Sequence, residues 1–198
     1  YVSSDRGRTW EKRGTATFPG GDWHESQLLE RKDGTLVVFA RVKDQKIGCM
    51  MISESKDGGL SWSKPCKPAN LTQVIARFGF LRLDNGHLVF VKNGPAPDKV
   101  NGNRREKLTA FLSEDEGRTW TGGLELDGRD RVAYPDIFQA PDGSIYVTYD
   151  HDRNTKSDQL LFAKFTEQDV LAGKVVTPGM SLQNVIFSEG HAERLVSQ

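Results

Sequence analysis

The chain has 198 residues, with 27 lysines and arginines against 27 aspartates and glutamates, so its formal net charge is zero. A chain without net charge has no general attraction to nucleic acid or to an anionic membrane surface, and we expect neither as a partner. No apolar stretch of the sequence approaches the length that crosses a bilayer, so no membrane span is expected. Twenty glycines and eight prolines are typical of short strands joined by turns.

An eight-residue pattern, Ser-x-Asp-x-Gly-x-(Thr/Ser)-Trp, occurs three times and is called the acidic box below. Its copies cover residues 3–10, 55–62 and 113–120, and their tryptophans lie 52 and 58 residues apart. Recurrence at this period indicates a repeat architecture. The Ser and Asp side chains can accept backbone hydrogen bonds, the Gly allows a left-handed turn, and the Trp is expected to anchor the turn to the core. Each box has a single fixed Asp and lacks the spacing of a calcium loop, so we expect structural turns.

A second pattern runs in step with the acidic boxes. Two apolar runs flank each of the turns Asp33-Gly34, Asn85-Gly86 and Asp142-Gly143, and such dipeptides are strong hairpin signals. The repeating unit is therefore a strand, a Gly turn, a strand, a loop, a strand, an acidic box and a strand. Four antiparallel strands in about fifty residues form one blade of a β-propeller, so the expected class is all-β.

One helix is expected. Thr166-Glu167-Gln168-Asp169 is a capping pattern, and it precedes the apolar run Val170-Leu171-Ala172. Gly173 predicts the end of this helix, which stands where the third blade would otherwise carry its acidic box.

The repeat divides the chain into the end of one blade, about 1–15, and three further blades at about 16–68, 69–126 and 127–198. A propeller closes into a ring of about 4–8 blades, which removes its sheet edges. We therefore expect further blades upstream of Tyr1, and a closed, monodisperse ring formed by this chain alone would contradict that. Cys49 and Cys66 flank an acidic box and could form a disulfide or stay as two thiols, so they fix no cellular compartment.

The phase of the repeat places polar residues at equivalent points of successive blades. Counting nine residues back and seven forward from each turn glycine gives two sets of three: Glu25, Arg77 and Tyr134, then Arg41, Asn93 and Asp150. Equivalent positions in radially repeated blades point to the axial mouth of the ring. Solvation of strand ends would explain any one of these residues but explains six less well, so we expect a pocket there.

The acidic boxes on this blade repeat resemble those of the sialidase (neuraminidase) superfamily, in its group of bacterial sialidase-like hydrolases with BNR repeats. The stretch from Glu25 to Arg41 resembles a sialidase segment in which a Glu precedes an Arg by about one and a half strands. Residues 105–108 (Arg-Glu-Lys-Leu) resemble the segment of another substrate arginine, and residues 134–137 (Tyr-Pro-Asp-Ile) resemble the segment of the catalytic tyrosine. The order Glu, Arg, box, Arg, box, Tyr is kept over nearly the whole chain.

The resemblance implies an exo-sialidase on a six-bladed propeller, about three blades of which are present here. Such an enzyme releases terminal sialic acid or a related acidic sugar from a sialylated or other acidic glycan, uses no cofactor or metal, and is secreted or periplasmic. Tyr134 would be the nucleophile and Glu25 the base that takes its proton. Tyrosine is the exception among retaining glycosidases, and a neutral nucleophile is not repelled by the carboxylate of the substrate.

The resemblance further implies that Arg41 and Arg105 are two of the three arginines that bind the substrate carboxylate. The planar fork of arginine suits a carboxylate better than lysine does. The phase of the repeat adds Arg77 and Asp150 to the substrate-binding set, although Arg77 could equally be a salt-bridged structural residue.

The chain also departs from the family pattern. It lacks the Arg-Ile-Pro segment that carries the first arginine of the family. No residue matches the general acid of the family. Asp22, Asp150 and Asp152 lie near the predicted mouth, but nothing in the sequence assigns that role to any of them. We therefore expect the nucleophile half of a site and very little activity in the isolated chain. Measurable turnover of an aryl sialoside by these 198 residues alone would contradict that expectation.

Two histidines lie close to the candidate residues. His24 could line the pocket beside Glu25, but a partly buried structural role is the simpler explanation. His151 stands between two aspartates, yet alternate strand residues face opposite sides of a sheet, so we do not expect a metal site.

Two other classes of function stay open. A polysaccharide lyase or another acidic-sugar hydrolase on the same fold would also use arginines for a carboxylate, and the lyase would give an unsaturated product that absorbs in the near ultraviolet. A non-catalytic glycan-binding or protein-binding propeller would keep its affinity in the variant Tyr134→Phe, which would abolish turnover in an enzyme.

Overall fold

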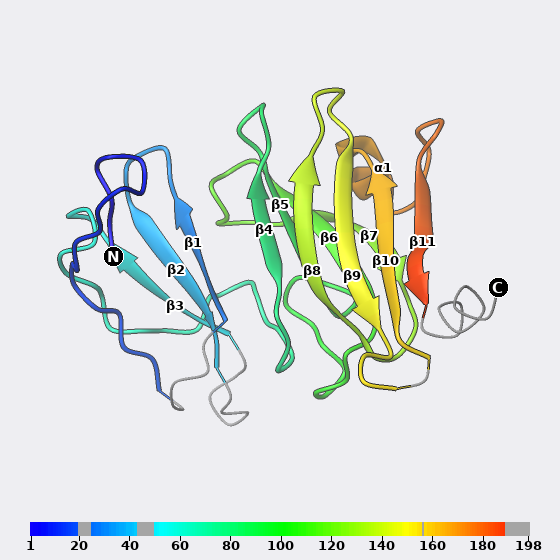
Figure 1. Cartoon of the computed structure of the whole chain (residues 1–198), viewed down its shortest axis with the longest axis horizontal. Helices are drawn as coiled ribbons and strands as arrows, with labels where there is room; N and C mark the ends of the chain where they lie inside the picture. The colour runs from blue at the N-terminus through cyan, green and yellow to red at the C-terminus, as the bar shows by residue number, and fades with distance from the viewer. Residues whose placement is uncertain (20–24, 43–49, 156, 189–198) are drawn as a thin grey trace. The chain divides into compact units, whose positions relative to one another are not determined.

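The computed structural model describes residues 1–19, 25–42, 50–155 and 157–188. Within these ranges the regular elements are three antiparallel sheets and one short helix (Figure 1). The chain divides into two compact units, residues 1–68 and residues 69–198. In the part of the chain that is described, no helix is long and apolar enough to cross a membrane.

The first unit contains a three-stranded sheet in the order β1-β2-β3. Its strands are β1 (Ser26–Glu30), β2 (Leu36–Arg41) and β3 (Met50–Ser55). The predicted hairpin joins β1 to β2, because Gly34 takes a φ of 81° and the Asp33 carboxylate accepts a hydrogen bond of 2.9 Å from the Thr35 N–H. The fourth strand expected for this blade is reduced, among the described residues, to an isolated bridge between Ile52 and Cys66. Cys66 is an exposed free thiol, and Cys49 lies outside the described residues.

The second unit contains two sheets that each have the four antiparallel strands expected of a blade. The first has the order β4-β5-β6-β7 and consists of β4 (Gly79–Arg82), β5 (Leu88–Asn93), β6 (Leu108–Ser113) and β7 (Thr121–Asp127). The second has the order β8-β9-β10-β11 and consists of β8 (Val132–Gln139), β9 (Ile145–His151), β10 (Gln159–Phe165) and β11 (Ser181–Ser188). The all-β fold expected from the repeat is therefore confirmed.

The core of the second unit is formed by side chains from both of its sheets. Its members include Val89 and Val91 of β5, Val147 of β9 and Phe165 of β10, each with no exposed surface. All six residues of β5 and all six of β6 are buried, as expected for central strands with both faces covered. Burying an aliphatic side chain of this size stabilises a fold by about 1.5–3 kcal/mol.

The predicted helix is α1 (Glu167–Ala172), and it forms as the capping pattern indicates. The Thr166 N–H donates a hydrogen bond of 2.8 Å to the Asp169 carboxylate, and Gly173 ends the helix in the left-handed conformation with a φ of 67°. The same carboxylate accepts bonds from the N–H groups of Val176 (2.6 Å) and Thr177 (2.8 Å), so one side chain fixes both the helix and the chain that follows it. The helix packs against β7 and β6.

The acidic boxes are closed turns whose carboxylates are fully engaged within the turn. In the first copy Asp5 accepts bonds from the Thr9 N–H (2.9 Å) and hydroxyl (2.6 Å), while Ser3 accepts one from the Gly7 N–H (2.7 Å). The copies at Asp57 and Asp115 repeat this pattern. The boxes therefore act as structural turns, as the sequence predicts.

The tryptophans of the boxes do not share one role. The indole N–H of Trp10 donates to the Gly7 carbonyl of its own turn (3.1 Å), and the side chain stays 63% exposed, so the expectation that it anchors a core is wrong. Trp120 instead packs on Phe80 and Phe90, with ring centroids 5.7 and 5.2 Å away. Aromatic partners on the neighbouring strands, rather than the box itself, decide whether the indole is covered.

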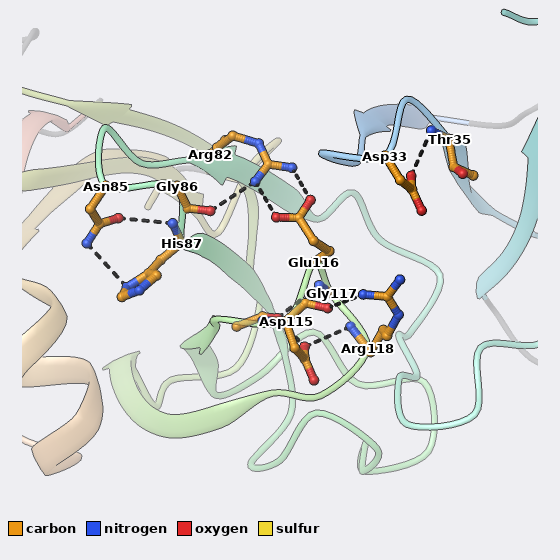
Figure 2. A network of polar contacts seen from close by, with 11 residues as sticks. Asp33, Thr35, Arg82, Asn85, Gly86, His87, Asp115, Glu116, Gly117 and Arg118 are labelled. Atoms are coloured by element: carbon orange, nitrogen blue, oxygen red, sulfur yellow. Dashed lines mark hydrogen bonds and ion pairs between the residues drawn. The ribbon is translucent and has the colours of Figure 1, made fainter. Parts of the chain in front are cut away.

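The third acidic box is tied to β4 by an additional ion pair. Figure 2 shows Arg82 donating from both terminal nitrogens to Glu116, at 2.9 and 2.7 Å, and to the Gly86 carbonyl at 2.9 Å. Such a bidentate contact is the strong form of the arginine–carboxylate pair. It joins the Gly turn of this sheet to its acidic box.

The box carboxylates generate a prediction about acid. Hydrogen bonds from Thr9 to Asp5, and from Ser61 to Asp57, lower the pKa of each aspartate to about 2 from the ordinary 3.8. Because the folded pKa is lowered, the stabilising contribution is complete above about pH 4 and is lost as the pH falls through 2. Carboxyl carbon NMR titration should give both midpoints near pH 2, and midpoints near 3.8 would contradict the hydrogen-bonded turn.

The contact between α1 and β7 generates a second prediction. Gly122 has a φ of 72°, and a Cβ there would overlap the Val170 carbonyl oxygen. The variant Gly122→Ala should therefore lose more stability than left-handed strain alone costs, which is about 1 kcal/mol. Gly179→Ala is the matched control, since Gly179 has a φ of 78° and nothing within 4 Å of the added carbon. Equal shifts of the urea unfolding midpoint in both variants would contradict the close packing.

Candidate functional site

The first unit contributes Glu25 and Arg41. Ser26 of β1 pairs with Ala40 of β2, so Glu25 and Arg41 are the next opposed positions at the open end of this hairpin. Their side chains meet, with Arg41 Nη1 3.0 Å from Glu25 Oε2. The contact is an ion pair rather than a hydrogen bond. Among the described residues, no donor is aligned well enough with the buried Oε2 atom of Glu25 to form one.

The second unit contributes Tyr134, which lies in an irregular part of β8. The register between β8 and β9 shifts between Ala133 and Asp136, as in a β-bulge, and Tyr134 takes a φ of 59°. A positive φ is rare for a bulky residue and costs about 1–3 kcal/mol, and such strain persists only where the surroundings enforce it. The half-buried ring packs against a small apolar cluster of Val74, Ala76 and Ala133.

Two arginines lie against the Tyr134 ring. The Arg153 Cζ atom is 3.9 Å from the ring centre, and the Arg105 Cζ atom is 5.4 Å from it. Arg105 is held by a hydrogen bond of 2.9 Å from Nη2 to the Ile75 carbonyl. The neighbouring Arg104 is 57% exposed and pairs with Glu106 and Asp130 instead. Arg105, which the family resemblance selects, is therefore the one of these two arginines that lies at Tyr134.

Asp150 contacts Arg153, one of the two arginines at the same tyrosine. It is on β9, opposite Ala133, and its side chain is only 15% exposed. Its Oδ2 atom is 3.3 Å from Arg153 Nε. Burial raises the pKa of Asp150 above its ordinary value, and this effect outweighs the opposing attraction of Arg153 and Arg105.

Arg77 and Asn93, the corresponding positions of the preceding sheet, have different surroundings. Arg77 forms an ion pair with Asp136 at 3.3 Å, and Asp136 is 73% exposed. Asn93 has no exposed surface, and its amide donates to the carbonyls of Val132 (2.9 Å) and Glu106 (3.2 Å). The expectation that Asn93 lines a pocket is wrong, because its amide is used to join β5 to the start of β8.

A second tyrosine of this unit, Tyr149, is unsuited to attack a substrate. It is fully buried, and its hydroxyl donates to the Asp127 carboxylate at 3.1 Å. Burial, reinforced by the Asp127 charge, raises the pKa of Tyr149. Arg129 also donates to Asp127, at 2.6 Å, so this network holds β7 to β9.

The remaining candidates that the structure describes, His151 and Asp152, have partners other than Tyr134. Asp22 and His24 lie outside the described residues. His151 lies 3.2 Å from the Gln159 side chain, and Asp152 pairs with Arg131. In the described ranges no group of three His, Cys, Asp or Glu side chains is placed to hold a metal ion. A cavity of about 490 Å³ in the first unit is lined by residues 12–16 and several neighbours but by none of the predicted site residues.

Sequence reasoning missed Arg153. It follows β9 in a turn whose length differs from those of the other hairpins, so it has no equivalent in the repeat phase. Its only signal in the sequence is its place three residues after Asp150, within reach of that carboxylate.

Comparison with known proteins agrees with the repeat architecture and the all-β fold. The family model of BNR repeat-like domains matches residues 1–147. The chain is 28% identical over 179 residues to a sialidase of Vibrio cholerae, covering 77% of this chain and 22% of the relative. It is 23% identical over 163 residues to an anhydrosialidase of Macrobdella decora, covering 75% and 21%. The chain thus spans about a fifth of the length of these curated relatives.

Solved structures show the same fold. The intramolecular trans-sialidase of Ruminococcus gnavus, solved with oseltamivir carboxylate, matches with a TM-score of 0.67 and 19% identity, over 89% of this chain and 38% of that one. The NanB sialidase of Streptococcus pneumoniae matches with a TM-score of 0.65 and 20% identity, over 85% and 27%. The sheets described above are therefore part of a sialidase-type β-propeller. Since the family model covers well over half of its residues, the chain belongs to the BNR repeat-like domain family and is a sialidase-like member of it.

Proposed function

We propose that the protein is a glycosidase of the exo-sialidase type, and that this chain carries the nucleophile half of its site. The observation that supports this most directly is Tyr134, a half-buried tyrosine in a left-handed conformation at a strand bulge, with two arginines against its ring. Strained residues cluster at functional sites, and a tyrosine nucleophile is the mark of retaining sialidases. The names of the relatives point to the same activity.

In the proposed reaction the Tyr134 oxygen attacks the anomeric carbon of a terminal sialic acid or a related acidic sugar. The phenol proton passes to a base and the new C–O bond forms. The bond to the aglycone breaks as a general acid from another part of the protein gives its proton to the leaving oxygen. Water then cleaves the tyrosyl intermediate, so the configuration is retained. Cations fixed beside the ring favour the negative charge that develops on the phenol oxygen.

The other proposed roles follow the order of the motifs along the chain. Glu25 is the base, and Arg41 and Arg105 bind the substrate carboxylate through their planar guanidinium groups. Arg77 is a further contact to the substrate, because an exposed ion pair such as Arg77–Asp136 is weak and can be exchanged for a ligand. A substrate among sialylated glycans would place the protein outside the cytoplasm, as a secreted or periplasmic enzyme.

A covalent trap tests the nucleophile. In a sialosyl fluoride that carries a second fluorine at C3, the leaving fluoride needs little protonation, and the C3 fluorine slows hydrolysis of the intermediate by destabilising its oxocarbenium-like transition state. With the complete ring of blades present, mass spectrometry of peptides should find the sugar on Tyr134. Tyr134→Phe should lose the adduct and at least about 100-fold of aryl sialoside turnover. An adduct on another residue would refute the assignment, and an unsaturated sugar product would indicate a lyase.

Two adjacent arginines provide a matched test of carboxylate binding in the protein with its complete ring of blades. Arg105→Lys keeps the charge but loses the planar fork, and it should raise KM for an aryl sialoside by about 10-fold or more. Arg104→Lys should leave KM within about twofold, because exposed ion pairs such as those of Arg104 contribute little. Equal effects of the two substitutions on initial-rate kinetics would contradict the role of Arg105.

A further inference from the structure

The backbone around Tyr134 does not by itself fix the direction of the ring. The pairing of β8 with β9 is regular from Asp136 onward and at Ala133, but the register shifts between these two residues. Tyr134 stands in this irregular stretch with a φ of 59°. A residue outside a regular ladder takes its side-chain orientation from its packing neighbours, since the pleat that alternates side chains is interrupted there.

Of the two arginines that contact the Tyr134 ring, Arg153 lies nearer to it. At 3.9 Å from its Cζ atom to the ring centre, the guanidinium group is in stacking contact with the phenol ring, whereas Arg105 is 5.4 Å away. Arginine combines a planar group with a positive charge, and both features favour contact with an aromatic face. The side chain is 43% exposed, so it covers the tyrosine at the surface of the unit.

Arg153 is held from two directions. Its Nε atom is 3.3 Å from the Asp150 carboxylate, and Asp150 lies opposite Ala133, the residue that precedes the tyrosine. The second is the backbone beside it, where Asp152 is tied to Arg131 and the flanking residues Asp152 and Asn154 are both left-handed, with φ of 59° and 66°. The Asp152 N–H donates to the Arg131 carbonyl at 3.1 Å, and the Asp152 carboxylate pairs with the Arg131 side chain.

We propose that Arg153 is a positioning residue for Tyr134, and that Asp150 acts by anchoring Arg153. The stacked guanidinium holds the phenol ring in the direction needed for attack, so a residue of the turn after β9 sets the orientation of a side chain on β8. This inference rests on the proposed role of Tyr134 as the nucleophile. It changes the role predicted for Asp150, from a substrate contact to the anchor of an arginine.

Fluorine NMR tests the contact independently of activity. The chain has four tyrosines, so incorporation of 3-fluorotyrosine gives four labelled sites, and Tyr134→Phe identifies the signal of Tyr134. Arg153→Gln and Asp150→Asn should both move that signal by more than its linewidth and leave the other three in place. Arg104→Lys is the control and should move none of them. An unchanged Tyr134 signal in folded Arg153→Gln protein would overturn the proposal.

Kinetics of the protein with its complete ring of blades separate positioning from substrate binding. Arg153→Gln should lower kcat by about 10-fold to 100-fold, as expected for a misdirected reacting group, with KM within about twofold. Arg153→Lys keeps the charge without the flat stack and should recover only part of kcat. A raised KM with unchanged kcat would overturn the proposal in favour of direct substrate binding. A displaced Tyr134 signal in a protein that releases no sugar would instead refute the proposed function and leave the contact standing.

Discussion

The register of the Gly-turn hairpin determines where the polar side chains of this chain lie. In each sheet the first two strands pair around a tight turn. In the regular hairpins, the residue nine positions before the turn glycine therefore lies opposite the residue seven positions after it. Ser26 opposite Ala40 brings Glu25 to Arg41, and Gly79 opposite Val91 brings Arg77 to the level of Asn93. The turn is short, and a slip by one residue would send every following side chain to the opposite face. The candidate residues of each hairpin therefore depend on the geometry of a glycine about nine residues away.

The third hairpin departs from this rule at Tyr134, the proposed nucleophile. Regular pairing, extended from Asp136 opposite Thr148, would put Tyr134 opposite Asp150, but Ala133 occupies that place instead. The extra residue frees Tyr134 from the ladder and lets it take a left-handed conformation. Bulges commonly re-aim a side chain next to an active site. In this conformation the Tyr134 ring packs on the cluster around Val74 and contacts the two arginines.

Most of the fold could be predicted from the sequence, because the turns and the helix cap that define it depend on residues only a few positions apart. The acidic boxes, the Gly turns and the cap of α1 are formed by neighbours in the chain, and each appears as expected. The exposure of Trp10 and the burial of Asn93 depend on which strands lie beside them, and a repeat phase carries no such information. Arg153 was missed for a related reason, because its contact with Tyr134 is made by a turn whose length is not repeated in the other hairpins.

The chain as a whole is neutral, but charged side chains are gathered at Tyr134. Arg105 and Arg153 bring two positive charges to Tyr134, and Asp150 brings one negative charge. Asp158 adds a further negative charge that acts on Asp150. Coulomb interactions in such partly buried surroundings are stronger than in water. Burial already disfavours the charged form of Asp150, which is why its pKa is raised despite two nearby arginines. Under the proposed function, the carboxylate of an anionic sugar that approached Tyr134 would meet the two guanidinium groups that lie against the phenol ring.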